Sequence, residues 1–187
     1  MPALVTRSSA NSAQSRDKAF LGRLLRCRRG STAVEFALIA APFLACLIAI
    51  FETGIAFYAQ AALQTATTQS ARLIMTGQAQ NQGLSAAQFR QQVCTNVTVL
   101  FNCAGIYVNV QKFASFSTAA VLNPLQNGNV NANSMNYLPG GPGDIVLVQV
   151  FYPWPTLVAP LGFNLSNMNG NNRLLMATAA FRNEPYQ

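Results

Sequence analysis

Hydrophobic residues are concentrated in one long run near the start of the chain. Residues 36–51 contain no charged side chain, and residues 55–58 continue the run beyond the single charge of Glu52. A helix from Ala33 to Tyr58 would be about 38 Å long, whereas the hydrocarbon core of a bilayer is about 30 Å thick. The pattern therefore predicts one membrane-spanning helix.

The helical pattern continues past this run into a more polar segment. Small and apolar residues recur there at helical spacing, namely Ala59, Ala62, Ala66 and Leu73. Gly77 follows as a natural helix end. We expect one long helix with a first part in the membrane and a second part outside it.

The rest of the chain alternates short apolar patterns with loops. Ser85 and Gln88 have capping-box spacing before apolar residues at helical intervals, which predicts a short helix. Residues 106–111 alternate apolar and polar side chains, which predicts a half-buried strand, and residues 144–152 and 174–181 predict two more strands. The predicted fold class is α+β: a long N-terminal transmembrane helix that extends into a small extracytoplasmic domain with a short helix and an antiparallel sheet.

Two intervening stretches carry their own expectations. Residues 123–143 are rich in Asn, Gly and Pro and predict a long loop. Residues 145–163 are apolar enough to raise the question of a second span. Gln149 and the prolines at 153, 155 and 160 argue against that span.

Charge is scarce and unevenly distributed. Charged residues make up 9% of the chain, against about 25% in an average protein. Of the net charge of +7, the first 30 residues supply +6, from seven Arg and Lys against Asp17, and the other 157 residues supply +1. Arginine beside a spanning helix stays in the cytoplasm, so residues beyond about 58 should lie outside it. No basic face follows residue 30, so we expect no nucleic-acid partner.

A short motif joins the basic segment to the apolar run. Arg28-Arg29-Gly30-Ser31-Thr32-Ala33-Val34-Glu35-Phe36 resembles the processing site of type IV-like prepilins, in which a basic leader ends in glycine and a glutamate is the fifth residue after the cut. Together with Phe51-Glu-Thr-Gly-Ile-Ala-Phe-Tyr-Ala-Gln and Ser70-Ala-Arg-Leu, it resembles the TadE-type pseudopilins of the tight adherence (Tad) pilus system. The resemblance covers about residues 30–77.

This resemblance implies a domain organisation and a set of partners. Residues 1–30 would be a cytoplasmic leader removed between Gly30 and Ser31, followed by a transmembrane segment at 31–58, a helical continuation at 59–76 and an α+β domain at 77–187. A minor pilin or pseudopilin of this kind implies a prepilin peptidase, other pilins and Tad assembly-platform proteins as partners, besides membrane lipid. We expect a single-pass protein of the bacterial inner membrane with its C-terminal domain outside the cytoplasm, available for incorporation into a surface pilus. The mature length argues against the much shorter major Flp-type pilin.

The candidate assembly residues lie around the cut. Cleavage would create an ammonium group at Ser31, and Glu35, next to Phe36, could neutralise it during docking of subunits. The alternative is that Glu35 lies in the first helical turn, after Ser31 and Thr32 as N-caps, and only complements the helix dipole. Glu52 is a possible subunit contact, or a hydrated carboxylate at the outer interface.

The cysteines differ in their expected surroundings. Cys27 would leave with the leader, and Cys46 is expected as a small packing residue in the span. Cys94 and Cys103 fall outside the cytoplasm, where disulfides are permitted. We predict a disulfide between Cys94 and Cys103. It requires Cα atoms within about 7 Å, but a continuous helix would hold them about 13 Å apart, so the helix must end before Asn102.

Catalytic chemistry finds little support in the sequence. Histidine, the commonest general base, is absent, and no two cysteines have the spacing of a zinc site. We expect no catalytic residue, no cofactor and no metal site. The other function left open is an uncleaved single-pass protein that anchors a binding domain in the cell envelope, and the N-terminal sequence of the membrane-extracted protein would distinguish the two.

Overall fold

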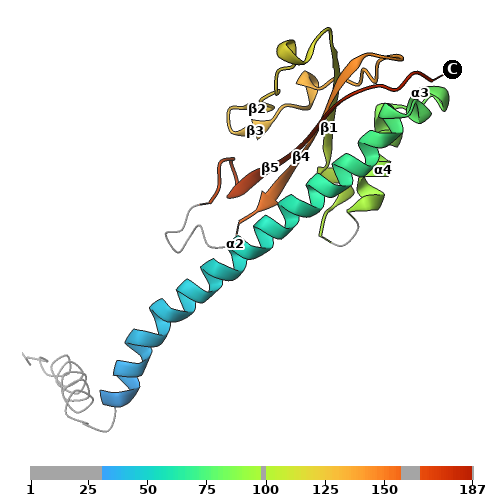
Figure 1. Cartoon of the computed structure of the whole chain (residues 1–187). Coiled ribbons are helices and arrows are strands. Elements are labelled where there is room, and N and C mark those ends of the chain that lie inside the picture. The colour runs from blue at the N-terminus through green and yellow to red at the C-terminus, as the bar shows by residue number, and fades with distance from the viewer. Residues whose placement is uncertain (1–30, 98–99, 157–164, 187) are drawn as a thin grey trace, which may run out of the picture. The chain divides into compact units, whose positions relative to one another are not determined.

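The computed structural model describes residues 31–97, 100–156 and 165–186 (Figure 1). By its internal contacts the chain divides into two units, Met1–Leu47 and Ile48–Gln187. The proposed leader 1–30, with Gly30, lies outside the described residues. The fold is α+β, with a long N-terminal helix, short helices and a small antiparallel sheet.

The long helix is α2, Ser31–Met75, with Pro42 inside it. Within the described residues it is the one helix that could cross a membrane, as judged by length and composition alone. Its most apolar 18-residue window has a mean hydropathy of 2.4, and none of that window is buried. The expected single long helix is therefore confirmed.

Helix α2 ends just before Gly77, as the sequence predicts. Gly77 has a φ of +77°, the left-handed conformation that ends helices, and its N–H donates to the carbonyl of Ile74. A Cβ at this position would overlap the ring of Tyr186, so the site also needs glycine for close packing. A four-residue helix, α3, Gln78–Asn81, follows directly.

The capping box also forms as the sequence predicts. Helix α4 is Ala86–Asn96, the N–H of Gln88 donates to the hydroxyl of Ser85, and the N–H of Ser85 donates to the side chain of Gln88. The expected short helix is confirmed, and it stops at Asn96.

The three predicted strands form one antiparallel sheet (Figure 1). Strands β1, Tyr107–Phe113, β4, Ile145–Pro155, and β5, Asn172–Arg182, have the order β1-β4-β5. Strand β4 continues three residues past the predicted end, through two prolines. Both lie beyond Phe151, the last β4 residue paired with β1, where β4 keeps only β5 as a partner. A sheet tolerates proline in such an edge position.

The long loop expected at 123–143 contains a small hairpin. Strands β2, Leu125–Gln126, and β3, Asn129–Val130, are joined by Asn127 and Gly128, which both have positive φ. An Asn-Gly pair between two short strands is the usual two-residue hairpin turn. The expected long loop therefore contains one hairpin that the sequence analysis did not predict, although the Asn-Gly dipeptide signals its turn.

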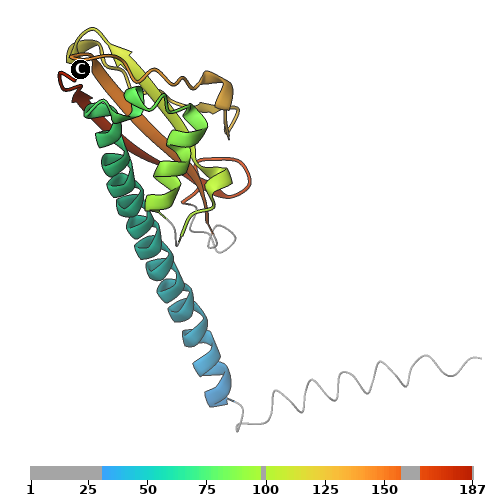
Figure 2. The same ribbon diagram turned by 90° about the vertical axis from the view of Figure 1, so that its right-hand side faces the viewer.

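The second half of α2 and helix α4 pack against one face of the sheet (Figure 2). The expected stripe on α2 is only partly correct, because Ala59 and Ala66 are buried while Ala62 and Leu73 are only half-buried. Leu63 and Ile74, outside the expected stripe, are fully buried. Which helix residues are buried depends on the side of α2 on which the sheet packs. The helical spacing of apolar residues alone does not predict that side.

The opposite face of the sheet differs from the sequence expectation. Asn109 and Gln149 are fully buried, although alternation placed Asn109 on the polar side of a half-buried strand. The Asn109 amide donates to Gln149 Oε1 at 3.0 Å, and the N–H groups of Leu122 and Asn136 donate to Gln149 and Asn109. These bonds hold the segment between β1 and β4 over the second face at β1 and β4, whereas Met176 of β5 on the same face remains 38% exposed.

Candidate functional site

The first part of α2 presents apolar side chains outward. From Thr32 to Leu47 no described residue is buried, and the exposed group includes Val34, Phe36, Leu38, Ile39, Phe43 and Leu44. A helix that is apolar around its circumference is stable only in lipid or among other helices. This surface is the first component of the candidate site.

Glu35 and Phe36 lie on this exposed helix, and the Phe36 side chain is 74% exposed. Because Ser31 is already helical, Glu35 is the fifth residue of α2 and no acidic residue lies in its first turn. The expectation that Ser31 and Thr32 cap the helix and that Glu35 lies in its first turn was wrong. The helix-dipole explanation for this glutamate is weakened, since that effect fades beyond the first turn.

Glu52 is not the hydrated carboxylate that the sequence allowed. It is 9% exposed and borders an almost wholly apolar groove of about 310 Å³ between α2 and the end of β4. The other groove residues include Phe51, Ile55, Trp154 and Pro155. Glu52 therefore lies at the border of an apolar surface rather than in open solvent.

A second groove, of about 300 Å³, lies on the other flank of α2. It is lined by Thr53, Ala56, Phe57, Gln60, Leu165, Arg173 and Leu175. Arg173 of β5 stands directly opposite Trp154 of β4 in the sheet register. Sequence reasoning missed this pair, because only the register of β4 and β5 brings the chain's one tryptophan beside this cation.

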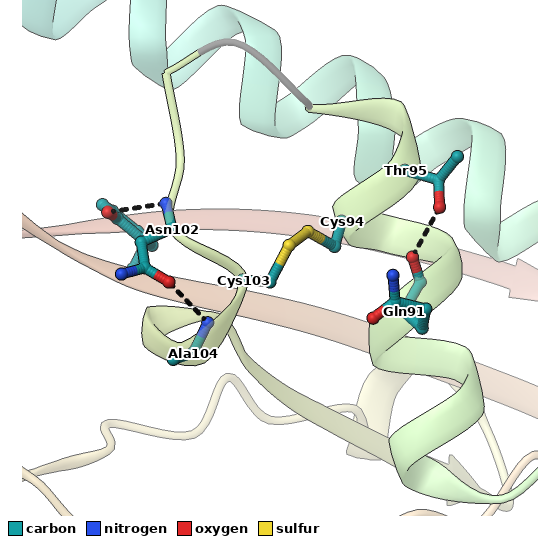
Figure 3. The surroundings of a disulfide bond; sticks show 7 residues. Gln91, Cys94, Thr95, Asn102, Cys103 and Ala104 are labelled. Atoms are coloured by element: carbon teal, nitrogen blue, oxygen red, sulfur yellow. Dashed lines mark hydrogen bonds between the residues drawn. A yellow bond between two sulfur atoms is a disulfide. The ribbon is translucent and has the colours of Figure 1, made fainter.

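A Cys94–Cys103 disulfide closes the turn after α4 (Figure 3), with Cα atoms 5.5 Å apart. The helix ends at Asn96, and the Asn102 side chain accepts from the Ala104 N–H at 3.0 Å, which stabilises the turn that returns the chain. Cys46 is an unbonded cysteine and is exposed, so the expected packing role is not realised within this chain.

The titratable side chains outside the span do not form a reactive cluster. Among the described residues, no three His, Cys, Asp or Glu side chains gather as metal ligands would. Lys112 and Asp144 form an exposed ion pair at 3.8 Å. Burial raises the pKa of the Tyr137 hydroxyl, and burial, with a smaller effect of the Asp144 charge, raises the pKa of Tyr186. Both hydroxyl groups therefore stay neutral near pH 7.

Taken together, the site is a long apolar helix that carries a small, disulfide-closed α+β domain. The family model of TadE-like proteins matches residues 30–72, which include α2 as far as Arg72. No curated protein and no solved structure matches the chain significantly. The TadE-like match suggests a protein associated with the Tad pilus, and this family implies interaction with other pilus components.

Proposed function

We propose that this chain is a minor pilin or pseudopilin that takes part in the assembly of a Tad-type pilus. The observation that carries the proposal is the coincidence of the TadE-like match with a continuous helix whose apolar side chains are exposed from Val34 to Tyr58. In a membrane these side chains face lipid, and in an assembled pilus they face the helices of other subunits. Adhesion and surface attachment follow from such a pilus.

The organisation that accompanies this function has four parts. A prepilin peptidase cuts between Gly30 and Ser31 and removes the leader, residues 31–58 span the inner membrane, and residues 59–76 continue the helix outside it. Residues 77–187 form the extracytoplasmic domain. The arginine-rich N-terminus supports this orientation, and so does the Cys94–Cys103 disulfide, since disulfides persist outside the cytoplasm.

Two carboxylates contribute to assembly in this proposal. Glu35 neutralises the new ammonium group at Ser31, on its own subunit or the next, and the pairing rewards correct docking in an apolar surrounding. Glu52, at the apolar groove beside Trp154, contacts a neighbouring subunit further along the helix.

N-terminal sequencing of the membrane-extracted protein tests this function. The expected sequence begins at Ser31, and Gly30→Leu should leave the full-length precursor in the membrane. Co-purification of the mature protein with Tad assembly proteins should accompany cleavage. An intact N-terminus in cells with an active peptidase would instead favour the uncleaved envelope-binding protein.

A further inference from the structure

The groove beside Arg173 has one cation in an otherwise uncharged lining. Thr53, Ala56, Phe57 and Gln60 of α2 form one wall, and the Gln60 amide donates to the Met176 carbonyl. Leu165, Arg173 and Leu175 lie across from them. Among the described residues, the Arg173 guanidinium makes one long bond, from Nη1 to the carbonyl oxygen of Leu165 at 3.5 Å. A guanidinium has five N–H groups, so Arg173 has further donors that can reach an acceptor entering the groove.

The position of this groove along α2 corresponds to a membrane surface. The exposed apolar side chains run from Val34 to Tyr58, which is about 36 Å of helix, against about 30 Å of hydrocarbon. The last turns of the run therefore reach headgroup depth. Thr53 and Phe57 belong to those turns, so the groove opens where lipid phosphates lie.

Side chains in and near the groove are of the types that anchor proteins at this depth. Phe57 lines the groove and is 70% exposed, and its neighbour Tyr58 is 67% exposed. Trp154 lines the other groove beside α2, but it is half-buried and stands opposite Arg173 in the sheet register. Tryptophan and tyrosine are enriched at membrane interfaces, and arginine extends its charge to the headgroups while its stem stays in apolar surroundings.

We infer that this groove binds the headgroup of an anionic phospholipid of the outer leaflet. The lipid phosphate pairs with the Arg173 guanidinium, and the upper acyl chain packs on Ala56 and Phe57. The inference rests on the proposed membrane span and orientation, but not on leader cleavage or pilus assembly. Lipid binding would set the height of the domain above the bilayer while the protein is in the membrane.

Trp154 gives a direct readout, since it is the only tryptophan in the chain and Arg173 lies about one strand spacing away. The full chain is reconstituted in phosphatidylcholine bilayers, and acyl-brominated phosphatidylglycerol or acyl-brominated phosphatidylcholine is added in increasing mole fraction. One arginine near a membrane surface gives about a fivefold preference for anionic lipid. We expect half-maximal quenching of Trp154 fluorescence at a mole fraction of brominated phosphatidylglycerol about fivefold lower than that of brominated phosphatidylcholine.

Three variants locate the effect. Arg173→Gln should remove the preference, and Arg173→Lys should retain it because the charge remains. Arg72→Gln is the matched control, since Arg72 is an exposed arginine further along the same helix, and it should keep the preference. Soluble glycerol phosphate should not compete, because it lacks the acyl chain that fills the apolar wall.

Each other outcome overturns the inference in a distinguishable way. If both lipids quench equally in a protein that has inserted into the bilayer, the proposed lipid site is refuted while the proposed membrane span still stands. Competition by glycerol phosphate would assign the groove to free phosphate. If quenching is weak but increases when the protein is diluted in the bilayer, a second copy of the chain occupies the groove, because dilution separates the copies and admits lipid. Failure to insert would overturn the span as well.

Discussion

Gln64 of α2 makes two hydrogen bonds with the backbone of Thr178 on β5. Its Nε2 donates to the Thr178 carbonyl at 2.7 Å, and its Oε1 accepts from the Thr178 N–H at 3.2 Å. One turn earlier, Gln60 Nε2 donates to the carbonyl of Met176 at 2.7 Å. The helix thus satisfies the outer edge of the sheet, where unpaired strand groups would otherwise invite another chain.

Gln64→Leu should destabilise the fold, because it leaves the N–H and C=O of Thr178 without partners. A loss of about 1–3 kcal/mol in the free energy of unfolding is expected, measured by denaturant titration of the full chain in detergent. Thr65→Ala is the control, since the Thr65 hydroxyl bonds only within its own helix, to Ala61. A variant as stable as the wild type would show that the edge bonds are replaced by water.

The Cys94–Cys103 disulfide should be present in protein recovered without reductant. Closing so short a loop is worth about 2–3 kcal/mol, so the double replacement by serine should lower stability by about that amount. Mass spectrometry after alkylation should find Cys46 labelled and Cys94 and Cys103 unlabelled. Cys46→Ser should leave stability nearly unchanged, because Cys46 is exposed and unbonded. Labelling of Cys94 and Cys103 in the wild type would contradict this prediction.

The Tyr137 hydroxyl is buried and has no hydrogen-bond partner among the described residues. Tyr137→Phe should therefore be neutral or stabilising, by up to about 1 kcal/mol at pH 7.

Tyr137 should also make the fold sensitive to alkali. Its pKa is raised above the usual 10.0, so the folded chain keeps a proton that the unfolded chain releases. Stability is then unaffected below pH 10 and falls as the pH rises above it. Tyr137→Phe should flatten this fall, measured as the free energy of unfolding against pH between 9 and 12. An unchanged alkaline slope in Tyr137→Phe would exclude Tyr137 as its source.

Elements with strong local signals could be predicted from the sequence. Four such features depend only on neighbouring residues, and all are present: the long helix, its end at Gly77, the capping box at Ser85 and the three strands. The turn that allows the disulfide followed from chain geometry, because no continuous helix can join Cys94 to Cys103.

Features that depend on distant parts of the chain could not be predicted in this way. The burial of Asn109 and Gln149 requires the segment between β1 and β4 to fold back over the sheet. The pairing of Arg173 with Trp154 depends on the register between β4 and β5. The contact of Gln64 with Thr178 depends on the path of α2 along the edge of the sheet. Neither register nor path is encoded in a local pattern.

The assembly step rests on Glu35, and its test separates cleavage from docking. Cleavage needs an accessible Gly30 and a hydrophobic anchor, and Glu35 lies beyond the bond, so Glu35→Gln should still be cut before Ser31. Docking then brings the ammonium group at Ser31 into an apolar helix bundle, where a charge without a partner costs several kcal/mol.

Glu35→Gln keeps the shape of the side chain and removes its charge, so the cut protein should accumulate in the membrane and fail to enter pili. Immunoblots of membrane and sheared-pilus fractions would measure both steps in one experiment. Thr32→Ala is the matched control, because it changes an exposed residue of the same helix start and leaves the charges intact. Normal entry of Glu35→Gln into pili would mean that charge pairing does not drive docking, and that the glutamate acts through shape alone.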